Sequence, residues 1–87
     1  MIVTLFHAQG CSLCDRAREQ LRPLRDELGF AYEEVDITGH PELEARYREW
    51  LPVVELDGER VFTYYVHEDA FRRRIEAGRS GEARPSS

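Results

Sequence analysis

Two cysteines lie where an apolar run gives way to a helical pattern, and this pair constrains the chain more than any other feature. Cys11 and Cys14 are its only cysteines. In a helix, residues three apart have Cα atoms roughly 5 Å from each other, a separation that a disulfide can bridge with little strain. A helix N-terminus also presents free N–H groups and a partial positive charge, which favour a thiolate at Cys11. The pair is therefore predicted to open and close reversibly.

The composition limits the fold and excludes several classes of function. With 87 residues, 41% hydrophobic and 33% charged, the chain is expected to form one small globular domain. Its net charge of −5 argues against nucleic acid or an anionic membrane as partner. All 12 basic residues are arginine, so no lysine can act as a Schiff-base former or general base. The apolar run from Met1 to Phe6 is too short for a signal peptide or a membrane span, so a cytoplasmic location is expected.

The first half of the sequence predicts a strand, a helix and a second strand. Residues 2–6 are β-branched and aromatic, as in a buried parallel strand. Apolar residues at spacings of three and four then predict one buried helix face: Cys14, Ala17, Leu21, Leu24 and Leu28. Gly29 caps this helix, and Pro23, which lacks an N–H, predicts a kink or a division into two short helices. Residues 30–37 complete a right-handed βαβ unit with the cysteines at the carboxyl edge of its first strand.

The second half predicts a helix, a hairpin and a last helix. The expected elements are a helix, two antiparallel strands and a final helix, over residues 41–50, 53–56, 60–65 and 66–78. Pro41 suits a first helical turn, and Asp57-Gly58 between two apolar runs is a strong hairpin signal. Gly78 is expected to close the last helix, and residues 79–87 are expected to form a flexible tail.

This order of elements, with a CxxC motif after the first strand and a proline opening the third, resembles the thioredoxin superfamily in its shortest form, the glutaredoxins. The segments that match in order and spacing are Phe6 to Cys14, Leu51-Pro52-Val53-Val54 and Asp57-Gly58. The resemblance implies one domain over residues 1–78 with the α/β, thioredoxin-like fold of glutaredoxin type (β-α-β-α-β-β-α). Its four-stranded mixed sheet would have the order 2-1-3-4, with the first and third helices on one face and the second on the other.

By the same resemblance, the chain is a small thiol–disulfide oxidoreductase of the dithiol glutaredoxin type. Cys11 is then the nucleophile, and Cys14 resolves the mixed disulfide. Pro52 is expected to be cis, with the backbone of Leu51 docking an extended substrate beside Ser12 and Leu13. The implied substrates are protein disulfides or glutathione mixed disulfides. The implied partner is a reductase system, and glutathione is a candidate reductant or co-substrate. We expect a monomer with no tightly bound cofactor and no metal.

Two other uses of the cysteine pair stay open. In one, the pair supplies thiolates to zinc or, across a dimer, to an iron–sulfur cluster, either of which needs two further ligands. In the other, the fold is a redox-sensing binding module that does not turn over. Ser12-Leu13 replaces the Pro-Tyr of many glutaredoxins, and residues 65–69 lack the glycines that family has before its last helix. The resemblance is therefore closer to glutaredoxin-like proteins than to glutathione-dependent ones.

The charged residues around the pair bear on its thiolate. His7 ends the first strand four residues before Cys11, and it is a candidate to tune or protonate that thiol. Asp15 follows the motif at once and opposes a thiolate, whereas Arg16 and Arg18 partly offset it. We therefore expect only a moderate depression of the Cys11 pKa. No acid occurs in residues 1–14, so the first strand has no carboxylate that could transfer protons to or from the cysteines, and that role falls to water or to a distant residue.

Overall fold

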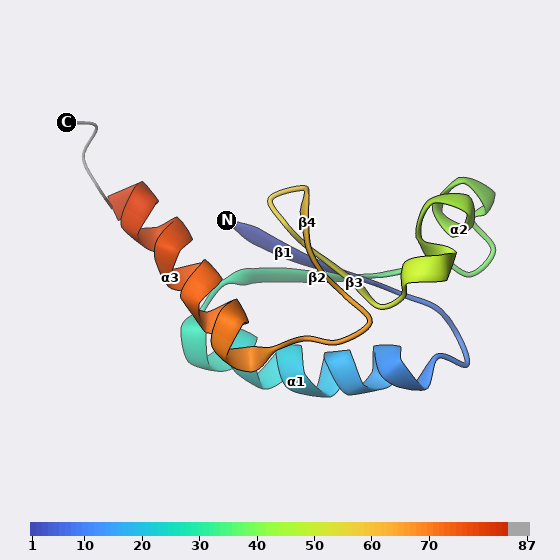
Figure 1. The fold of residues 1–87 in the computed structure, drawn as a ribbon, viewed down its shortest axis with the longest axis horizontal. Coiled ribbons are helices and arrows are strands. Elements are labelled where there is room, and N and C mark those ends of the chain that lie inside the picture. The colour runs from blue at the N-terminus through green and yellow to red at the C-terminus, as the bar shows by residue number, and fades with distance from the viewer. Residues whose placement is uncertain (84–87) are drawn as a thin grey trace.

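The computed structural model describes residues 1–83 and contains the predicted order of elements (Figure 1). The elements are β1 (Ile2–His7), α1 (Ser12–Leu28), β2 (Ala31–Asp36), α2 (Pro41–Tyr47), a 3₁₀ turn η1 (Arg48–Trp50), β3 (Val53–Leu56), β4 (Glu59–Thr63) and α3 (Glu68–Ala83). The sheet has the order β2-β1-β3-β4, with β1 parallel to β2 and antiparallel to β3, and β3 antiparallel to β4. The predicted thioredoxin-like fold and its strand order are confirmed.

The helices cover both faces of the sheet, as expected. Alternate residues of β1 point to opposite faces, so Val3 and Leu5 join one core cluster and Phe6 joins the other. The larger cluster packs α1 and α3 on one face, and the smaller packs α2 on the other (Figure 1). Further members of the larger cluster are Ala17, Leu21, Leu24, Phe30, Val54, Val66, Phe71 and Ile75, and those of the smaller are Ile37, Tyr47 and Val53. This packing holds the cysteine-bearing end of α1 beside the sheet.

Helix α1 runs through Pro23 without a break. The alternative of two short helices is therefore wrong. Leu21 and Leu24, on either side of the proline, are both buried in the same cluster, so packing holds the two halves in line. Gly29 ends the helix with φ 73°, and its N–H donates to the Arg25 carbonyl at 2.7 Å. This is the left-handed C-cap that the glycine predicted.

The hairpin predicted from Asp57-Gly58 forms between β3 and β4 around a two-residue turn, because Glu59, expected between the strands, already opens β4. Asp57 has φ 52° and Gly58 has φ 84°, as a type I′ turn requires. The turn is also bound to the start of β1. The Asp57 carboxylate accepts from the Ile2 N–H at 2.8 Å, and the Asp57 N–H donates to the Ile2 carbonyl at 2.9 Å. The hairpin is therefore anchored to the first residues of the chain.

The last third of the chain differs from the prediction in two places. Strand β4 ends at Thr63 instead of residue 65, because Tyr64 adopts φ 68° and turns the chain away. Helix α3 begins at Glu68 instead of residue 66 and continues to Ala83, so its expected end at Gly78 is wrong. A Cβ at Gly78 would lie 2.6 Å from the Met1 Cε. The glycine therefore serves the packing of Met1 against α3.

The structure covers only part of the predicted C-terminal tail, and it does not test the predicted location. The flexible tail was expected over residues 79–87, of which 79–83 are helical and 84–87 lie outside the described residues. Across residues 1–83, each helix is too short or too polar to span a membrane. The cytoplasmic location stays a prediction.

Pro23→Ala is expected to stabilise the protein. Pro23 is exposed, so its removal loses little packing, and the substitution restores the N–H that hydrogen-bonds the Glu19 carbonyl. An interior helical proline costs about 3 kcal/mol relative to alanine, and the proline's lower unfolded-state entropy offsets part of this. We expect a gain of about 1–2 kcal/mol in the free energy of unfolding, measured by urea denaturation. Glu19→Ala is the matched control, and an equal gain in both variants would contradict this explanation.

Candidate active site

The cysteine pair lies at the junction of β1 and α1. Cys11 is the N-cap of α1 with an extended backbone (φ −99°, ψ 104°), and Gly10 before it has φ 75°. A side chain at Gly10 would be strained at this φ, so glycine suits the turn into the helix. Cys11 and Cys14 form a disulfide with their Cα atoms 5.2 Å apart, as the helical spacing predicted.

The two cysteines differ in exposure. Cys14 is fully buried on the face of α1 that packs on the sheet, whereas Cys11 is partly exposed. The Cys11 Sγ accepts a hydrogen bond from the Cys14 N–H at 3.1 Å. In the reduced protein, the same N–H and the helix N-terminus would stabilise a negative charge on this sulfur. The geometry therefore makes Cys11 the cysteine that a reactant can approach.

The predicted substrate-binding residues come from two segments at one end of the sheet. Ser12 is exposed and Leu13 is partly exposed in the first turn of α1. The Leu51-Pro52 peptide is cis, as the resemblance implied. Phe6 pairs with Val53, so Pro52 lies at the carboxyl end of β1, the end from which the chain continues to the cysteines. Figure 1 shows η1 and the start of α1 at this end.

Tyr64 is a neighbour of this site that the sequence did not reveal. Its N–H donates to the Pro52 carbonyl at 3.0 Å, and its hydroxyl donates to the Glu49 carbonyl at 2.9 Å. Its ring lies 6.2 Å from the exposed ring of Trp50. A tyrosine rarely adopts a positive φ, so no sequence pattern could have placed Tyr64 outside β4. Tyr64 therefore links the segment after β4 to the segment around Pro52.

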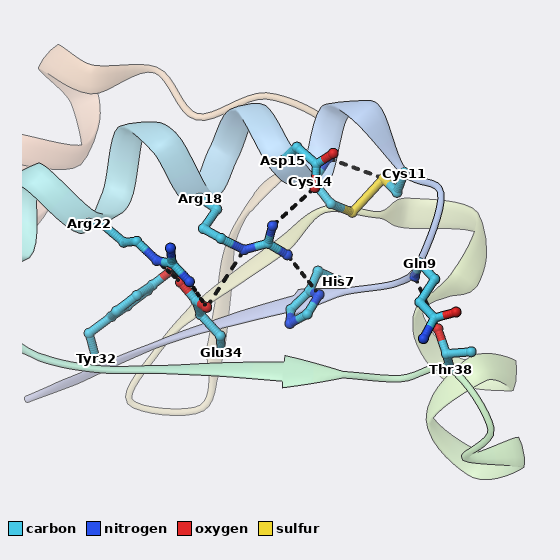
Figure 2. A network of polar contacts seen from close by, with 10 residues as sticks. All are labelled: His7, Gln9, Cys11, Cys14, Asp15, Arg18, Arg22, Tyr32, Glu34 and Thr38. Carbon is cyan, nitrogen blue, oxygen red and sulfur yellow. Dashed lines mark hydrogen bonds and ion pairs between the residues drawn. A yellow bond between two sulfur atoms is a disulfide. The ribbon is translucent and has the colours of Figure 1, made fainter.

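A network of polar contacts extends from the cysteine turn along α1 to β2 (Figure 2). The Arg18 guanidinium donates to the Asp15 Oδ1 at 3.0 Å and to the His7 Nδ1 at 3.0 Å. Its Nε lies 3.6 Å from the Glu34 Oε1, and Glu34 also accepts two bonds from Arg22, at 2.9 and 2.8 Å. Glu34 of β2 thus joins this network as the ion-pair partner of both Arg18 and Arg22. The spacing of Arg18 and Arg22 on one helix face was the only signal for it.

His7 takes part in this network through Arg18. Among the described residues, its ring hydrogen-bonds Arg18 and neither cysteine. An Nδ1 that accepts from a guanidinium belongs to a neutral ring with its proton on Nε2. Burial and the Arg18 charge lower the pKa of His7, against smaller opposing effects from Asp36, Glu34 and Asp15. A direct role for His7 in protonating Cys11 stays a prediction.

Two further ionisable groups of the network are held in one charge state. The hydrogen bond from Arg22 lowers the pKa of Glu34, so this carboxylate is ionised at neutral pH. Burial, together with the hydrogen bond that Tyr32 donates to Glu34 at 2.8 Å, raises the pKa of Tyr32. Among the side chains that the structure describes, no three His, Cys, Asp or Glu residues cluster as a metal site would require.

Comparison with known proteins assigns the family. Residues 2–76 match the family described as Glutaredoxin-like domain (DUF836). The chain belongs to this glutaredoxin-like family. It is similar to an uncharacterized protein of Mycobacterium tuberculosis, at 41% identity over 83 residues that cover 90% of this chain and 84% of that protein.

Solved structures support the fold. The solution structure of a protein from X. campestris has a TM-score of 0.69 and 28% identity, covering 88% of this chain and 95% of that chain. The structure of reduced Escherichia coli glutaredoxin has a TM-score of 0.59 and 24% identity, with coverages of 88% and 95%. At that identity, the likeness to glutaredoxin concerns the fold alone. The predicted family and fold are therefore confirmed.

The depressed pKa of His7 predicts a loss of stability in mild acid. The unfolded chain takes up a proton near pH 6.5, before the folded chain does, so the free energy of unfolding falls as the pH drops through this value. His7→Asn keeps an acceptor for Arg18 but cannot titrate. Urea unfolding between about pH 7.5 and pH 5.5, above the range of most carboxylates, should show a smaller loss in this variant than in the wild type.

The control for this experiment is His40→Asn. His40 is the N-cap of α2, and its side chain makes no cap hydrogen bond. An equal reduction of the loss in this variant would mean that the effect does not come from His7. Parallel stability curves for wild type and His7→Asn would show that the ring does not titrate differently in the folded protein.

Proposed function

We propose that the chain is a dithiol thiol–disulfide oxidoreductase that reduces disulfides through Cys11 and Cys14. The observation that carries this proposal is the unequal exposure of the pair, with a partly exposed Cys11 at a helix N-terminus and a fully buried Cys14. Membership of the glutaredoxin-like family and the CxxC spacing support it. A structural bridge closing so short a loop would add little stability.

The reaction needs two exchange steps. The Cys11 thiolate attacks one sulfur of the substrate disulfide, which forms a mixed disulfide and releases the other substrate sulfur as a thiolate that takes a proton. Cys14 then loses its proton and attacks the Cys11 Sγ, which expels the second substrate thiolate. The substrate gains two electrons and two protons, and the chain is left with the Cys11–Cys14 disulfide. The Cα separation of 5.2 Å suits closure of this bond.

Substrate binding is proposed at the carboxyl end of β1, where both the first turn of α1 and the Leu51-Pro52 segment lie. Ser12 and Leu13 beside the nucleophile, with the backbone of Leu51, would form the surface for an extended segment. The buried cis Pro52 would fix the direction of the Leu51 backbone. Protein disulfides are the first substrate class and glutathione mixed disulfides the second. The segment from Tyr64 to His67 that leads into α3 lacks the glycines that let glutathione approach closely in the glutaredoxins, which favours the protein substrates. Regeneration by a reductase system or by glutathione completes the cycle.

Single cysteine variants test the proposed order of attack. Cys11→Ser is expected to lose all reduction of a protein disulfide, because the exposed thiolate is gone. Cys14→Ser should still attack but cannot release the product, so mass spectrometry should find a mixed disulfide on Cys11. Glu19→Ser, at an exposed position of the same helix, is the control and should keep wild-type turnover.

The outcomes separate this proposal from the other uses of the pair. Turnover that survives in Cys11→Ser would rule the mechanism out. A redox sensor would show stoichiometric oxidation without multiple turnover. A metal or cluster site would retain zinc or iron after purification, with ligands drawn from beyond the cysteine pair.

A further inference from the structure

Arg18 is the most densely contacted charged side chain near the cysteine pair. Its three guanidinium nitrogens each meet a different group: Nη1 meets Asp15 at 3.0 Å, Nη2 meets His7 at 3.0 Å, and Nε meets Glu34 at 3.6 Å. These partners come from α1, β1 and β2, as Figure 2 shows. The Arg18 side chain is only 23% exposed. Its position is therefore fixed from three sides.

The helix geometry directs Arg18 toward the cysteine turn. Arg18 follows Cys14 by four residues, so the two side chains lie on the same face one turn apart. Helical side chains tilt toward the N-terminus, which carries the guanidinium back over the turn that holds Cys14 and Asp15. The contact with Asp15 shows that it reaches this turn. A partly buried charge there is less screened than an exposed one.

Each of the two carboxylates in the network, Asp15 and Glu34, is paired with an arginine. Asp15 directly follows Cys14, and its carboxylate opposes a thiolate on the pair. Arg18 cancels this charge through a contact at 3.0 Å. Glu34 would be balanced without Arg18, because Arg22 binds it with two hydrogen bonds at 2.9 and 2.8 Å. Loss of Arg18 would leave the Asp15 carboxylate beside the cysteines without its ion-pair partner.

We propose that Arg18 is a positioning residue that holds the Asp15 carboxylate, cancels its charge, and thereby shifts the equilibrium of the Cys11–Cys14 pair toward the dithiol. The inference rests on the proposed function only in that the pair must open and close. In the step concerned, reduced dithiothreitol gives two electrons and two protons to the protein disulfide. The Cys11–Cys14 bond breaks, and dithiothreitol closes into its own cyclic disulfide.

The test is this equilibrium, measured in dithiothreitol redox buffers for the full chain. Arg18→Met keeps the length of the side chain and removes the charge. We expect the equilibrium constant for reduction to fall about threefold to tenfold, which corresponds to roughly 15 to 30 mV at 29.6 mV per tenfold. The Cys11 thiol pKa, followed by thiolate absorbance, should rise. Neither readout depends on a substrate or on turnover.

Three further variants test whether the effect comes from the charge of Arg18 or from the contacts that hold its side chain. Arg18→Lys keeps the charge but not the planar contacts, and its equilibrium should stay within about twofold of the wild type. Asp15→Asn removes the opposing charge and should shift the equilibrium toward the dithiol. Because Asp15 is exposed, this variant is expected to fold, and it tests the proposal if Arg18→Met does not fold. The double variant Asp15→Asn with Arg18→Met should return close to the wild type.

Arg22→Met is the matched control. Arg22 shares the partner Glu34 and the helix face with Arg18, but it lies one turn further from the cysteines and does not contact Asp15. Its equilibrium should change less than twofold. The proposal is overturned if Arg18→Met leaves the equilibrium unchanged, or if Arg22→Met shifts it equally. A chain without turnover toward any disulfide would instead contradict the proposed function, while the comparison among variants would still stand.

Discussion

The packing of α1 against the sheet determines where the cysteine pair lies and how its two members differ. Cys14 belongs to the same buried stripe as Ala17, Leu21 and Leu24. Burial of that stripe fixes the rotation of the helix, and Cys11, as the residue before its first turn, is left at the surface. The difference between an accessible and a protected sulfur thus follows from helix periodicity and the hydrophobic effect. No other interaction is needed to make Cys11 accessible and Cys14 buried.

Most of the fold could be predicted because its signals are local. Gly29 and the Asp57-Gly58 turn need positive φ, and the structure has positive φ at all three residues. The spacing of apolar residues located α1, and the cysteine motif located its first turn. Each of these features depends on a few neighbouring residues, so a single sequence contains the information.

The features that could not be predicted depend on partners distant in sequence. Gly78 looked like a helix end, yet α3 continues past it, and Met1, from the other end of the chain, lies against this glycine. Glu34 and Arg18 are 16 residues apart and meet only because β2 lies beside β1. Tyr64 adopts a backbone angle that its type disfavours, and contacts with Pro52 and Glu49 hold it there. Such pairings are properties of the assembled sheet.

The central place of β1 has a consequence for synthesis on the ribosome. One edge of β1 pairs with β2 soon after it in the chain, but the other edge pairs with β3, and its first residue also binds Asp57 in the hairpin turn. A nascent chain that ends before residue 53 therefore exposes a row of unpaired backbone groups on its most apolar strand. Folding cannot be completed until the hairpin has emerged, so the nascent chain carries an aggregation-prone edge until then.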